Sequence, residues 1–437
     1  MTQPLVTPGQ ALHRQLRTPL GISGKSLHRP EGKNGDLDTE KRRFIARDEL
    51  QRIIQGLLYL EGHPVAGCNR NLIGNEVKII PRADGSNARF VGPISCKDVH
   101  VCPVCSSHIC EHRRLELQFG IRNHAAKGGA VYLLTLTVPH TLEMPLASIL
   151  DKLRMALQRF KNCKTYKRIL GTPMHPGKYR RIGSVRSLEI TVGPNGWHPH
   201  THDLVFCDPG LLDDYRALEE LRHEWTRILL KVGLGDSTKQ NDMLAHAFDL
   251  RGGDYAAEYV AKFGRQPELH GWGITDELTR THAKLGTKAG HLVPFALPRL
   301  YRDGDSKAGA LFVEYAKAIS GERMVYWSPG LKTALGVKDA TDEDLISAPL
   351  PDEAPAIIIN SSQWWLAVTR NARGELRYWA AKYREQGVTA FLDELAARPK
   401  THRGSFDTES SRSWNHEIRS PFVAADLILV GEPEYRG

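Results

Sequence analysis

Two adjacent strand-like segments constrain the fold of this 437-residue chain more than any other feature. Residues 184–192 and 197–206 are rich in β-branched and aromatic side chains, and a Gly-Pro-Asn-Gly turn at 193–196 joins them. This pattern predicts an antiparallel hairpin, because such turn residues are typical of tight connections between strands. A further strand is expected at Val131–Val138, between a Gly-Gly pair and a proline. The chain is therefore expected to build an antiparallel sheet around the hairpin.

Segments with helical apolar spacing alternate with these strands. They are expected at 48–58, 109–126, 146–163, 211–232, 253–263 and 308–319. Because there is no regular βαβ period, the sequence predicts the α+β class with a mainly antiparallel sheet. No apolar run approaches the ~20 residues of a membrane-spanning helix, and the N-terminus carries no apolar leader. We therefore expect a cytoplasmic protein without a membrane partner.

Histidines alternate along the second strand of the hairpin, at His198, His200 and His202. Residues two apart in a strand point to one face, with Cα atoms ~6.6 Å apart, so these imidazoles should converge. A plausible hairpin register places Glu189 beside them, whereas Asp203 points to the opposite face. Neutral imidazoles suit a divalent transition metal, and a carboxylate beside them also allows Mg²⁺ or Mn²⁺. A lone histidine is usually a surface or core residue, but three in alternation beside a glutamate favour a metal site.

A tyrosine-bearing helix is expected after the double glycine at 252–253. Tyr255 and Tyr259 share one face of this helix, and Lys262 lies about one turn further along the chain. A tyrosine oxygen can attack a phosphodiester when a metal polarises the phosphate and a cation stabilises the developing charge. Taken alone, the two tyrosines would more simply be core aromatics. Their place after the histidine strand favours a catalytic role.

Cysteines cluster in the first quarter of the chain. Cys102 and Cys105 have the spacing of a zinc knuckle, and Cys96 and Cys68 precede them. These four predict a tetrahedral Zn²⁺ site. The alternatives for one ligand position are Cys110, His100, His108 and His112. Buried free thiols are the simpler alternative, and a redox pair is disfavoured because no thioredoxin-like βαβ pattern surrounds the motif.

Positive charge is concentrated between the cysteines and the histidines. The whole chain has 59 Lys and Arg against 50 Asp and Glu, whereas residues 111–190 have 15 against 5. Basic residues interleaved with aromatics suit phosphate contacts and base stacking, although a solvated helix face is the alternative. The predicted DNA-contacting residues are Arg159, Lys161, Lys164, Lys167, Arg168, Lys178, Arg180 and Arg181.

Three segments, in chain order, resemble the motifs of the HUH endonucleases: the strand at 133–137, His200-Thr201-His202, and Tyr259-Val-Ala-Lys262. More closely, the chain resembles the plasmid rolling-circle replication initiators, or Rep proteins. The other matching segments are Phe90–Cys96 with Cys102–Cys105, Gly196–His202, and Gly321–Lys332, which contains Trp-Ser-Pro-Gly. The resemblance covers roughly residues 67–341. Thr201 departs from the bulky apolar residue that the family usually has between its histidines.

This resemblance implies a site-specific DNA endonuclease and strand transferase. Its fold would be the HUH endonuclease fold, a central five-stranded antiparallel sheet with flanking helices, plus a small Cys-rich zinc-binding element. Tyr259 would nick the plasmid origin and keep a 5′-phosphotyrosine, leaving a 3′ hydroxyl that primes a host DNA polymerase. A host helicase is the other implied partner. Some relatives have Glu where this chain has Tyr255. The strand would therefore be rejoined by a second tyrosine, or a carboxylate such as Glu258 or Asp254 would activate a water or hydroxyl to end the reaction.

The implied organisation has five parts. They are a flexible N-terminal arm at 1–45, a helix and Cys-rich zinc-binding element at 46–115, the catalytic domain at 116–275, the C-terminal part of the Rep domain at 276–345, and an extension of unknown role at 346–437. Two alternatives remain: an HUH-type single-strand transposase, which keeps the same motif order, and a non-catalytic zinc-finger DNA-binding protein. A conjugative relaxase is disfavoured, because its tyrosine normally precedes the histidine motif.

Overall fold

The computed structural model describes residues 33–253 and 291–399. By its contacts the chain divides into one unit at Met1–Leu392 and a second at Asp393–Gly437. Both sheets and both candidate metal centres lie in the first unit. The second unit contains the end of the last helix. In the described ranges, every helix is too short or too polar to cross a bilayer.

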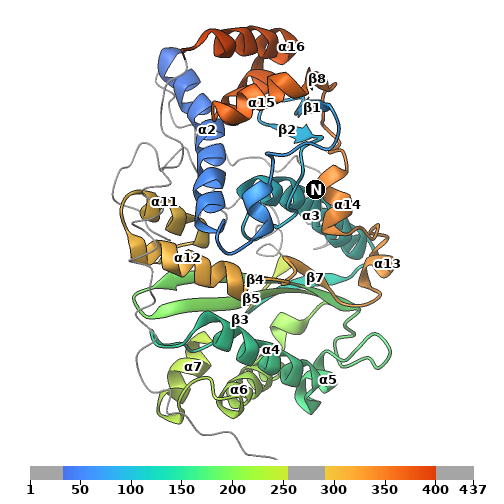
Figure 1. Cartoon of the computed structure of the whole chain (residues 1–437). Coiled ribbons are helices and arrows are strands. Elements are labelled where there is room, and N and C mark those ends of the chain that lie inside the picture. Colours follow the sequence, from blue (N-terminus) through green and yellow to red (C-terminus); the bar gives the residue numbers. More distant parts are fainter. Residues whose placement is uncertain (1–32, 254–290, 400–437) are drawn as a thin grey trace, which may run out of the picture. The chain divides into compact units, whose positions relative to one another are not determined.

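A five-stranded antiparallel sheet, with the order β6-β3-β5-β4-β7, carries the histidine hairpin (Figure 1). Its strands are β3 (Ala130–Thr137), β4 (Gly183–Gly193), β5 (Gly196–Cys207), β6 (Phe248–Arg251) and β7 (Val325–Trp327). The strands β4 and β5 pair along their full length, up to Gly193 opposite Gly196. Gly196 has a φ of 89°, and a Cβ there would lie 2.8 Å from the Thr141 carbonyl oxygen, so the turn requires glycine. The α+β class and the antiparallel sheet are confirmed, and β5 is the central strand.

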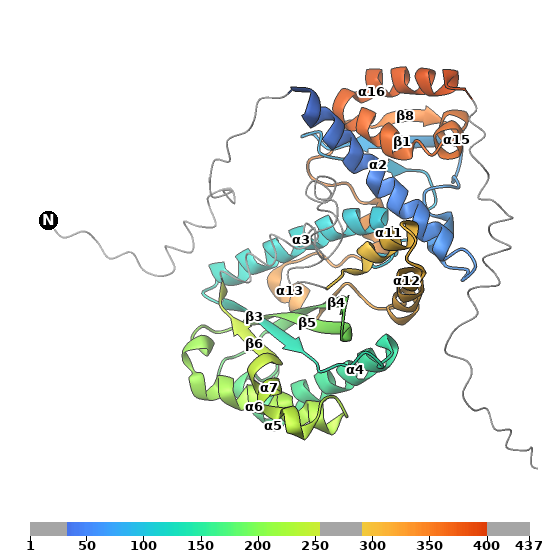
Figure 2. The same cartoon turned by 90° about the vertical axis from the view of Figure 1, so that its left-hand side faces the viewer.

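Helices cover both faces of this sheet, as the two perpendicular views show (Figures 1 and 2). On one side lie α4 (Leu146–Asn162), α5 (Lys164–Ile169), α6 (Tyr215–Lys231) and α7 (Gln240–His246). On the other lie α3 (Pro103–Ala126) and α13 (Leu331–Leu335). The first side buries an aromatic cluster in which the Phe160 ring lies 5.3 Å from Trp225 and 6.5 Å from Phe248. Each fully buried ring of this kind contributes roughly 1.5–3 kcal/mol, which fixes α4 and α6 against the sheet.

A smaller antiparallel sheet has the order β2-β1-β8. It consists of β1 (Glu76–Pro81), β2 (Ala88–Val91) and β8 (Ile357–Asn360), with α2 (Lys33–Leu57), α15 (Ser361–Thr369) and α16 (Arg373–Ala397) nearby (Figure 2). Although β8 follows the main sheet in the chain, it pairs with β1, from Glu76 opposite Asn360 to Ile79 opposite Ile357. Part of the segment expected as an extension, 346–437, therefore shares a sheet with the segment 46–115. The five-part division itself remains a prediction.

The Trp-Trp pair of α15 is split between core and surface. Trp364 is fully buried, its Nε1 donates to the Arg70 carbonyl at 3.0 Å, and its ring meets Phe90 edge-on at 4.9 Å. Trp365 is 43% exposed. Trp364 thus belongs to the core beside the small sheet. Its contact with Phe90 packs α15 against β2.

Most expected helices are present with shifted ends. The helix expected from Ile109 begins at Pro103, since proline fits the first helical position. The helix expected from Leu211 is a short 3₁₀ turn followed by α6, whose N-cap is the Asp214 side chain. The helix α2 starts at Lys33, inside the stretch expected as a flexible arm. The remaining α-helices in residues 33–253 and 291–399 are α11 (Leu297–Arg302), α12 (Ser306–Ala318) and α14 (Asp342–Ser347).

Candidate metal centres

The β4–β5 hairpin brings Glu189, His200 and His202 together, and these three residues are called the Glu189 group below. Glu189 lies directly opposite His200 in the strand register. The Glu189 Oε2 atom lies 3.0 Å from His202 Nε2 and 3.3 Å from His200 Nε2. One ligand atom from each residue falls within 4.8 Å of the other two. Ligand atoms about 2.1 Å from one ion lie within about 4 Å of each other, so this group has the dimensions of a single metal site.

The electrostatics of the group favour an ionised carboxylate. Glu189 is 19% exposed, and each histidine is 14% exposed. Burial would raise the pKa of Glu189, but hydrogen bonds from His200 and His202 lower it to about 2. A carboxylate and two imidazoles at a partly open surface form a donor set that accepts Mg²⁺, Mn²⁺ or a transition metal.

The outer contacts of the two histidines differ. Thr135, opposite His202 on β3, places Oγ1 3.0 Å from His202 Nδ1. This contact fixes the ring, and Nε2 then faces Glu189. The Nδ1 atom of His200 is buried and has no hydrogen-bond partner among the described residues. Sequence reasoning did not identify Thr135, although its place on the strand that pairs with the histidine strand was an available signal.

His198 shares this face but lies outside the Glu189 group. Its Nδ1 is 3.4 Å from Nδ1 of His140, and its ring centroid is 6.1 Å from that of His291. Burial, followed by the charges of His200, His140 and His291, lowers the pKa of His198 to about 3. The ring is therefore neutral at physiological pH. His140 and His291 were missed from the sequence, because each joins the cluster from a separate segment.

On the face of β5 opposite the histidines, charged residues make contacts within the protein. Asp203 points away from the histidines, as the alternation predicts, and accepts from Lys161 Nζ at 2.8 Å. Arg181 is also buried, donates to the Gly171 carbonyl at 3.1 and 3.2 Å, and lies over the Tyr166 ring. The charged groups of Lys161, which is partly exposed, and of the buried Arg181 are thus both engaged by protein partners.

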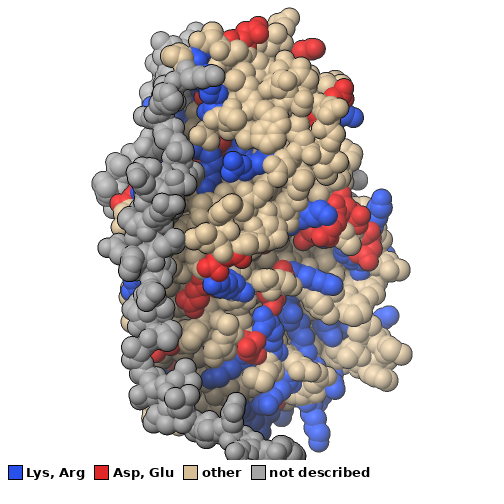
Figure 3. Space-filling view, viewed as in Figure 1, with Lys and Arg blue, Asp and Glu red and all other residues tan. Residues whose placement is uncertain are grey.

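The other six predicted DNA-contacting residues are exposed. They are Arg159, Lys164, Lys167, Arg168, Lys178 and Arg180. Figure 3 shows Lys and Arg gathered over α4 and α5. Two of the six are paired on the surface, Arg168 with Glu220 and Lys178 with Asp214. Exposed pairs of this kind are weak, so their cations remain available to a polyanion.

The predicted catalytic residues Tyr255, Glu258, Tyr259 and Lys262 lie outside the described residues, as does the helix expected at 253–263. The described chain stops at Gly253, two residues after β6. The strand β6 pairs with β3 and places Asp249 opposite Thr135. The end of β6 therefore lies beside the strand that supports His202, with Arg251 opposite Leu133.

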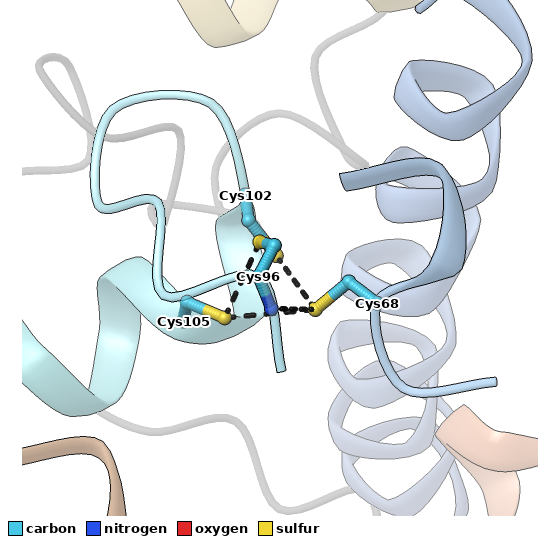
Figure 4. Close-up of side chains that lie close together, drawn as sticks. All are labelled: Cys68, Cys96, Cys102 and Cys105. Carbon is cyan, nitrogen blue, oxygen red and sulfur yellow. Dashed lines mark hydrogen bonds between the residues drawn. The ribbon is translucent and has the colours of Figure 1, made fainter. Parts of the chain in front are cut away.

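Four cysteines form a second cluster, called the cysteine group below (Figure 4). The Cys68 Sγ atom lies 3.7 Å from Cys102 Sγ and 3.6 Å from Cys105 Sγ, and Cys96 Sγ lies 3.7 Å from Cys105 Sγ. Four sulfurs about 2.3 Å from one Zn²⁺ in a tetrahedron would be roughly 3.8 Å apart. The residues present therefore fit a Zn²⁺ site, and they are the four ligands preferred from the sequence.

Donors around Cys102 favour its thiolate form, whereas hydrogen bonds with Cys102 and Cys105 raise the pKa of Cys68 and of Cys96. Gln51 of α2 donates to Cys102 Sγ at 3.3 Å, and the Cys96 backbone N–H donates to Cys68 Sγ at 3.4 Å. Burial would raise the pKa of Cys102, but hydrogen bonds from Cys105, Cys68 and Cys96 lower it well below its usual range.

The alternative ligands are engaged elsewhere. Cys110 Sγ lies 3.4 Å from Met324 Sδ, His100 Nε2 lies 3.1 Å from the Glu322 carbonyl, and both His108 and His112 contact the Ala348 carbonyl. These contacts point the four side chains to other parts of the structure.

Comparison with known proteins bears on the resemblance noted in the sequence. The chain is 26% identical over 373 residues to "Protein rep" of Streptomyces lividans, which covers 67% of this chain and 76% of that protein. The resemblance to a Rep protein is confirmed. The chain is also 29% identical over 155 residues to a "Neomycin resistance protein" of Streptomyces cyanogenus. This match covers 29% of this chain and 33% of that protein. No family model and no solved structure matches the chain.

The match to the Rep protein extends far beyond the three short motifs that first indicated it. A similarity over 67% of the chain is broader than the histidine hairpin or the cysteine group alone. The Rep resemblance therefore no longer depends on the tyrosine segment, which lies outside the described residues.

Proposed function

We propose that this chain initiates rolling-circle replication of a plasmid by nicking one strand of the replication origin. The observation that carries the proposal is the convergence of His200 Nε2 and His202 Nε2 on one oxygen of Glu189, at 3.3 and 3.0 Å. Three protein ligands at a partly exposed surface leave coordination positions for a substrate oxygen, as catalytic metal sites require. The similarity to a Rep protein supplies the replication context, and the five-stranded sheet with its histidines on the central strand is compatible with the HUH fold.

In this proposal Glu189, His200 and His202 hold Mg²⁺ or Mn²⁺, which would polarise the scissile phosphate. The Tyr259 oxygen forms a bond to phosphorus while the bond from phosphorus to the 3′ oxygen breaks. The phenolic proton leaves and the 3′ oxygen takes one up, so the step yields a 5′-phosphotyrosine and a free 3′ hydroxyl. Lys262 would stabilise the charge that develops on the phosphate. Rejoining would use Tyr255 as a second nucleophile, or Glu258 as a base.

The exposed basic residues over α4 and α5 would guide the DNA backbone. Phosphate contacts of this kind give affinity that depends on salt but carry no sequence information. In this scheme the cysteine group holds Zn²⁺ and has a structural role. The partners would be plasmid origin DNA, in double- and single-stranded form, a host helicase, and the host DNA polymerase that extends the 3′ hydroxyl.

The test is nicking of supercoiled DNA that carries the origin of the chain's own replicon. With Mg²⁺ or Mn²⁺ we expect an open-circular product and a covalent protein–DNA adduct that survives denaturation. Tyr259→Phe should abolish the adduct and leave origin binding nearly unchanged, while Tyr255→Phe tests the second nucleophile. An adduct at normal yield in Tyr259→Phe would move the nucleophile elsewhere, and nicking in excess chelator would refute the metal mechanism.

The same assay separates the alternatives. Origin binding without any nick in the wild-type chain would favour a non-catalytic zinc-finger DNA-binding protein. Nicking followed by joining to an unrelated target strand would favour a single-strand transposase. Nicking and rejoining confined to the origin is the outcome expected of a replication initiator.

A further inference from the structure

A cavity of about 50 Å³ lies in the part of the first unit that contains the small sheet. Residues from α2, β1, β2, α3 and α16 line it. One buried water needs roughly 10–15 Å³, so the cavity has room for a small polyatomic ion. None of the described lining residues belongs to the Glu189 group or to the cysteine group. The cavity is therefore separate from both candidate metal centres.

The lining is strongly cationic. It includes four arginines, Arg47, Arg82, Arg89 and Arg377, whereas Glu353 is the one acid among the described lining residues. Glu353 binds Arg89, with contacts of 2.6 Å to Nε and 3.0 Å to Nη2. Arg82 pairs with Asp352 outside the cavity at 2.6 Å. The acids nearby thus fall short of neutralising the arginines that face the cavity.

Among the lining arginines, Arg377 has the most unused hydrogen-bond donors. Its side chain is 1% exposed and lies over the Phe90 ring, 4.5 Å from the centroid. Both Nη1 and Nη2 are buried without a hydrogen-bond partner among the described residues. A buried guanidinium with unused donors is costly, because it has lost its water without gaining acceptors. Arg89 adds a further buried donor, since its Nη1 also lacks a partner in the described part of the chain.

Nearby negative groups do not supply these acceptors. Asp48 and the thiols of Cys102 and Cys68 exert a field at Arg377, yet burial still lowers the pKa of its guanidinium to about 10. The Asp48 carboxylate is engaged with a different arginine, Arg373, at 3.2 Å from Nε. The field of the cysteines therefore offsets part of the charge but leaves the directed N–H groups of Arg377 unsatisfied.

We propose that this cavity binds one phosphate-class oxyanion through the unused Nη groups of Arg377 and Arg89. A tetrahedral oxyanion presents acceptor oxygens in a geometry that the planar guanidinium fork matches. The volume admits a phosphate group but not a base and sugar with it. The ligand is therefore either a free phosphate ion or a terminal phosphate of a nucleic acid. This site does not depend on the proposed nicking activity.

The test uses the full chain with its zinc retained, exchanged into phosphate-free buffer at fixed ionic strength. Calorimetric titration with inorganic phosphate should show one site per chain, and thermal unfolding in the presence of phosphate should show a rise in Tm. Arg377→Met should lose this phosphate-dependent rise. It should also be no less stable than the wild type without phosphate, since the buried charge is gone. The matched control is Arg43→Met, an exposed arginine one turn before Arg47 on α2, which should respond like the wild type.

A second variant keeps the proposal testable if Arg377→Met fails to fold. Arg377→Lys retains the charge but loses the fork, and its affinity for phosphate should fall at least tenfold. An equal rise in Tm for the wild type and both Arg377 variants would overturn the proposal, because phosphate would then act elsewhere. Loss of zinc from Arg377→Met, with or without phosphate, would also overturn it, because Arg377 would then serve as the counter-charge of the thiolates.

Competition identifies the source of the phosphate. A short oligonucleotide with a 5′ phosphate should displace inorganic phosphate if the natural ligand is a nucleic-acid end, and the same oligonucleotide without that phosphate should not. If neither oligonucleotide competes while inorganic phosphate binds, the ligand is the free ion. Absence of binding by inorganic phosphate and by the phosphorylated oligonucleotide would refute the site.

Discussion

The two candidate metal centres of this chain differ in ligand number, exposure and origin. The cysteine group has four sulfurs, and Cys68, Cys102 and Cys105 are at most 1% exposed. The Glu189 group has three ligands that are 14–19% exposed. Closed four-ligand sites hold structural zinc, whereas three-ligand sites with open positions serve catalysis. We therefore expect the first group to contribute to stability and the second to catalysis.

The groups also differ in how the chain assembles them. His200, His202 and Glu189 lie on one hairpin, so the strand register alone places them. The cysteines come from the end of a 3₁₀ turn, a loop and the start of α3, and they meet only when those segments pack. Metal binding at the cysteines should therefore be coupled to folding, whereas the histidine hairpin should be formed before metal binds.

The largest expected effect comes from Cys102→Ser. Removal of one thiolate from a closed Zn²⁺ site should lower the free energy of unfolding by more than about 4 kcal/mol. Thermal unfolding and zinc content, measured together, check this. Cys163→Ser is the control, because Cys163 lies outside the group and caps α5 by accepting from the Tyr166 N–H, a role that serine fills well. An unchanged Tm in Cys102→Ser would show that the cysteine group has no structural role.

The next effect, on activity and not on stability, is expected for His202→Ala. If the ion at the Glu189 group contributes several kcal/mol to the transition state, nicking should fall roughly 10²–10³-fold. Stability should change far less than in Cys102→Ser. Single-turnover nicking and thermal unfolding measure the two quantities, and His175→Ala, at an exposed histidine, is the control. Large destabilisation with normal nicking would reverse the roles assigned to the two groups.

The sequence predicted the features that depend on neighbouring residues. The alternation at 198–202 and the turn at 193–196 predicted the hairpin and the approach of His200 and His202 to Glu189, because strand periodicity and turn chemistry act over a few residues. His198, expected from the same alternation, lies outside the group. Pairings between distant segments could not be predicted in this way. The pairing of β1 with β8 and the approach of His291 to His198 depend on the packing of the whole unit.

The sequence also could not predict which basic residues are engaged within the protein and which are exposed. Lys161 and Lys164 look alike within one basic run, yet the first reaches Asp203 beneath the sheet and the second is exposed. The difference arises because Lys161, near the end of α4, lies within reach of Asp203 on β5, whereas Lys164 begins α5. A run of charges therefore indicates an electrostatic tendency, and the tertiary structure decides which members can meet DNA.

A smaller effect is expected at the contact that orients His202. Thr135→Val keeps the shape of the side chain but removes the hydroxyl 3.0 Å from His202 Nδ1. Loss of such an outer contact typically weakens metal binding 10–100-fold. Titration of the protein with Mn²⁺ measures this, and Thr135→Ser, which keeps the hydroxyl, should bind like the wild type. Equal affinity in Thr135→Val would show that the hairpin alone fixes the ring.

The smallest effect concerns how the two regions respond to acid. Glu189 stays ionised because its pKa is about 2, so mild acid leaves that carboxylate unchanged. On the cysteine-bearing side, His108 of α3 is 8% exposed and its Nε2 lies 3.1 Å from the Ala348 carbonyl. Burial, Arg89 and His112 lower the pKa of His108 to about 4, against the opposing effects of this carbonyl and Glu353.

Between pH 6.5 and 4 the unfolded chain therefore binds a proton at His108 that the folded chain does not. The free energy of unfolding must then fall as the pH falls, by at most about 1.4 kcal/mol per pH unit from this group and about 1 kcal/mol between pH 6.5 and 5.5. His108→Gln keeps a donor for Ala348 and should remove that part of the slope. Denaturant unfolding in phosphate-free buffer measures it, because an anion in the arginine-lined cavity would raise the pKa of His108 and reduce the slope. Parallel curves for wild type and variant would mean that acid acts on the cysteine-bearing region through other groups.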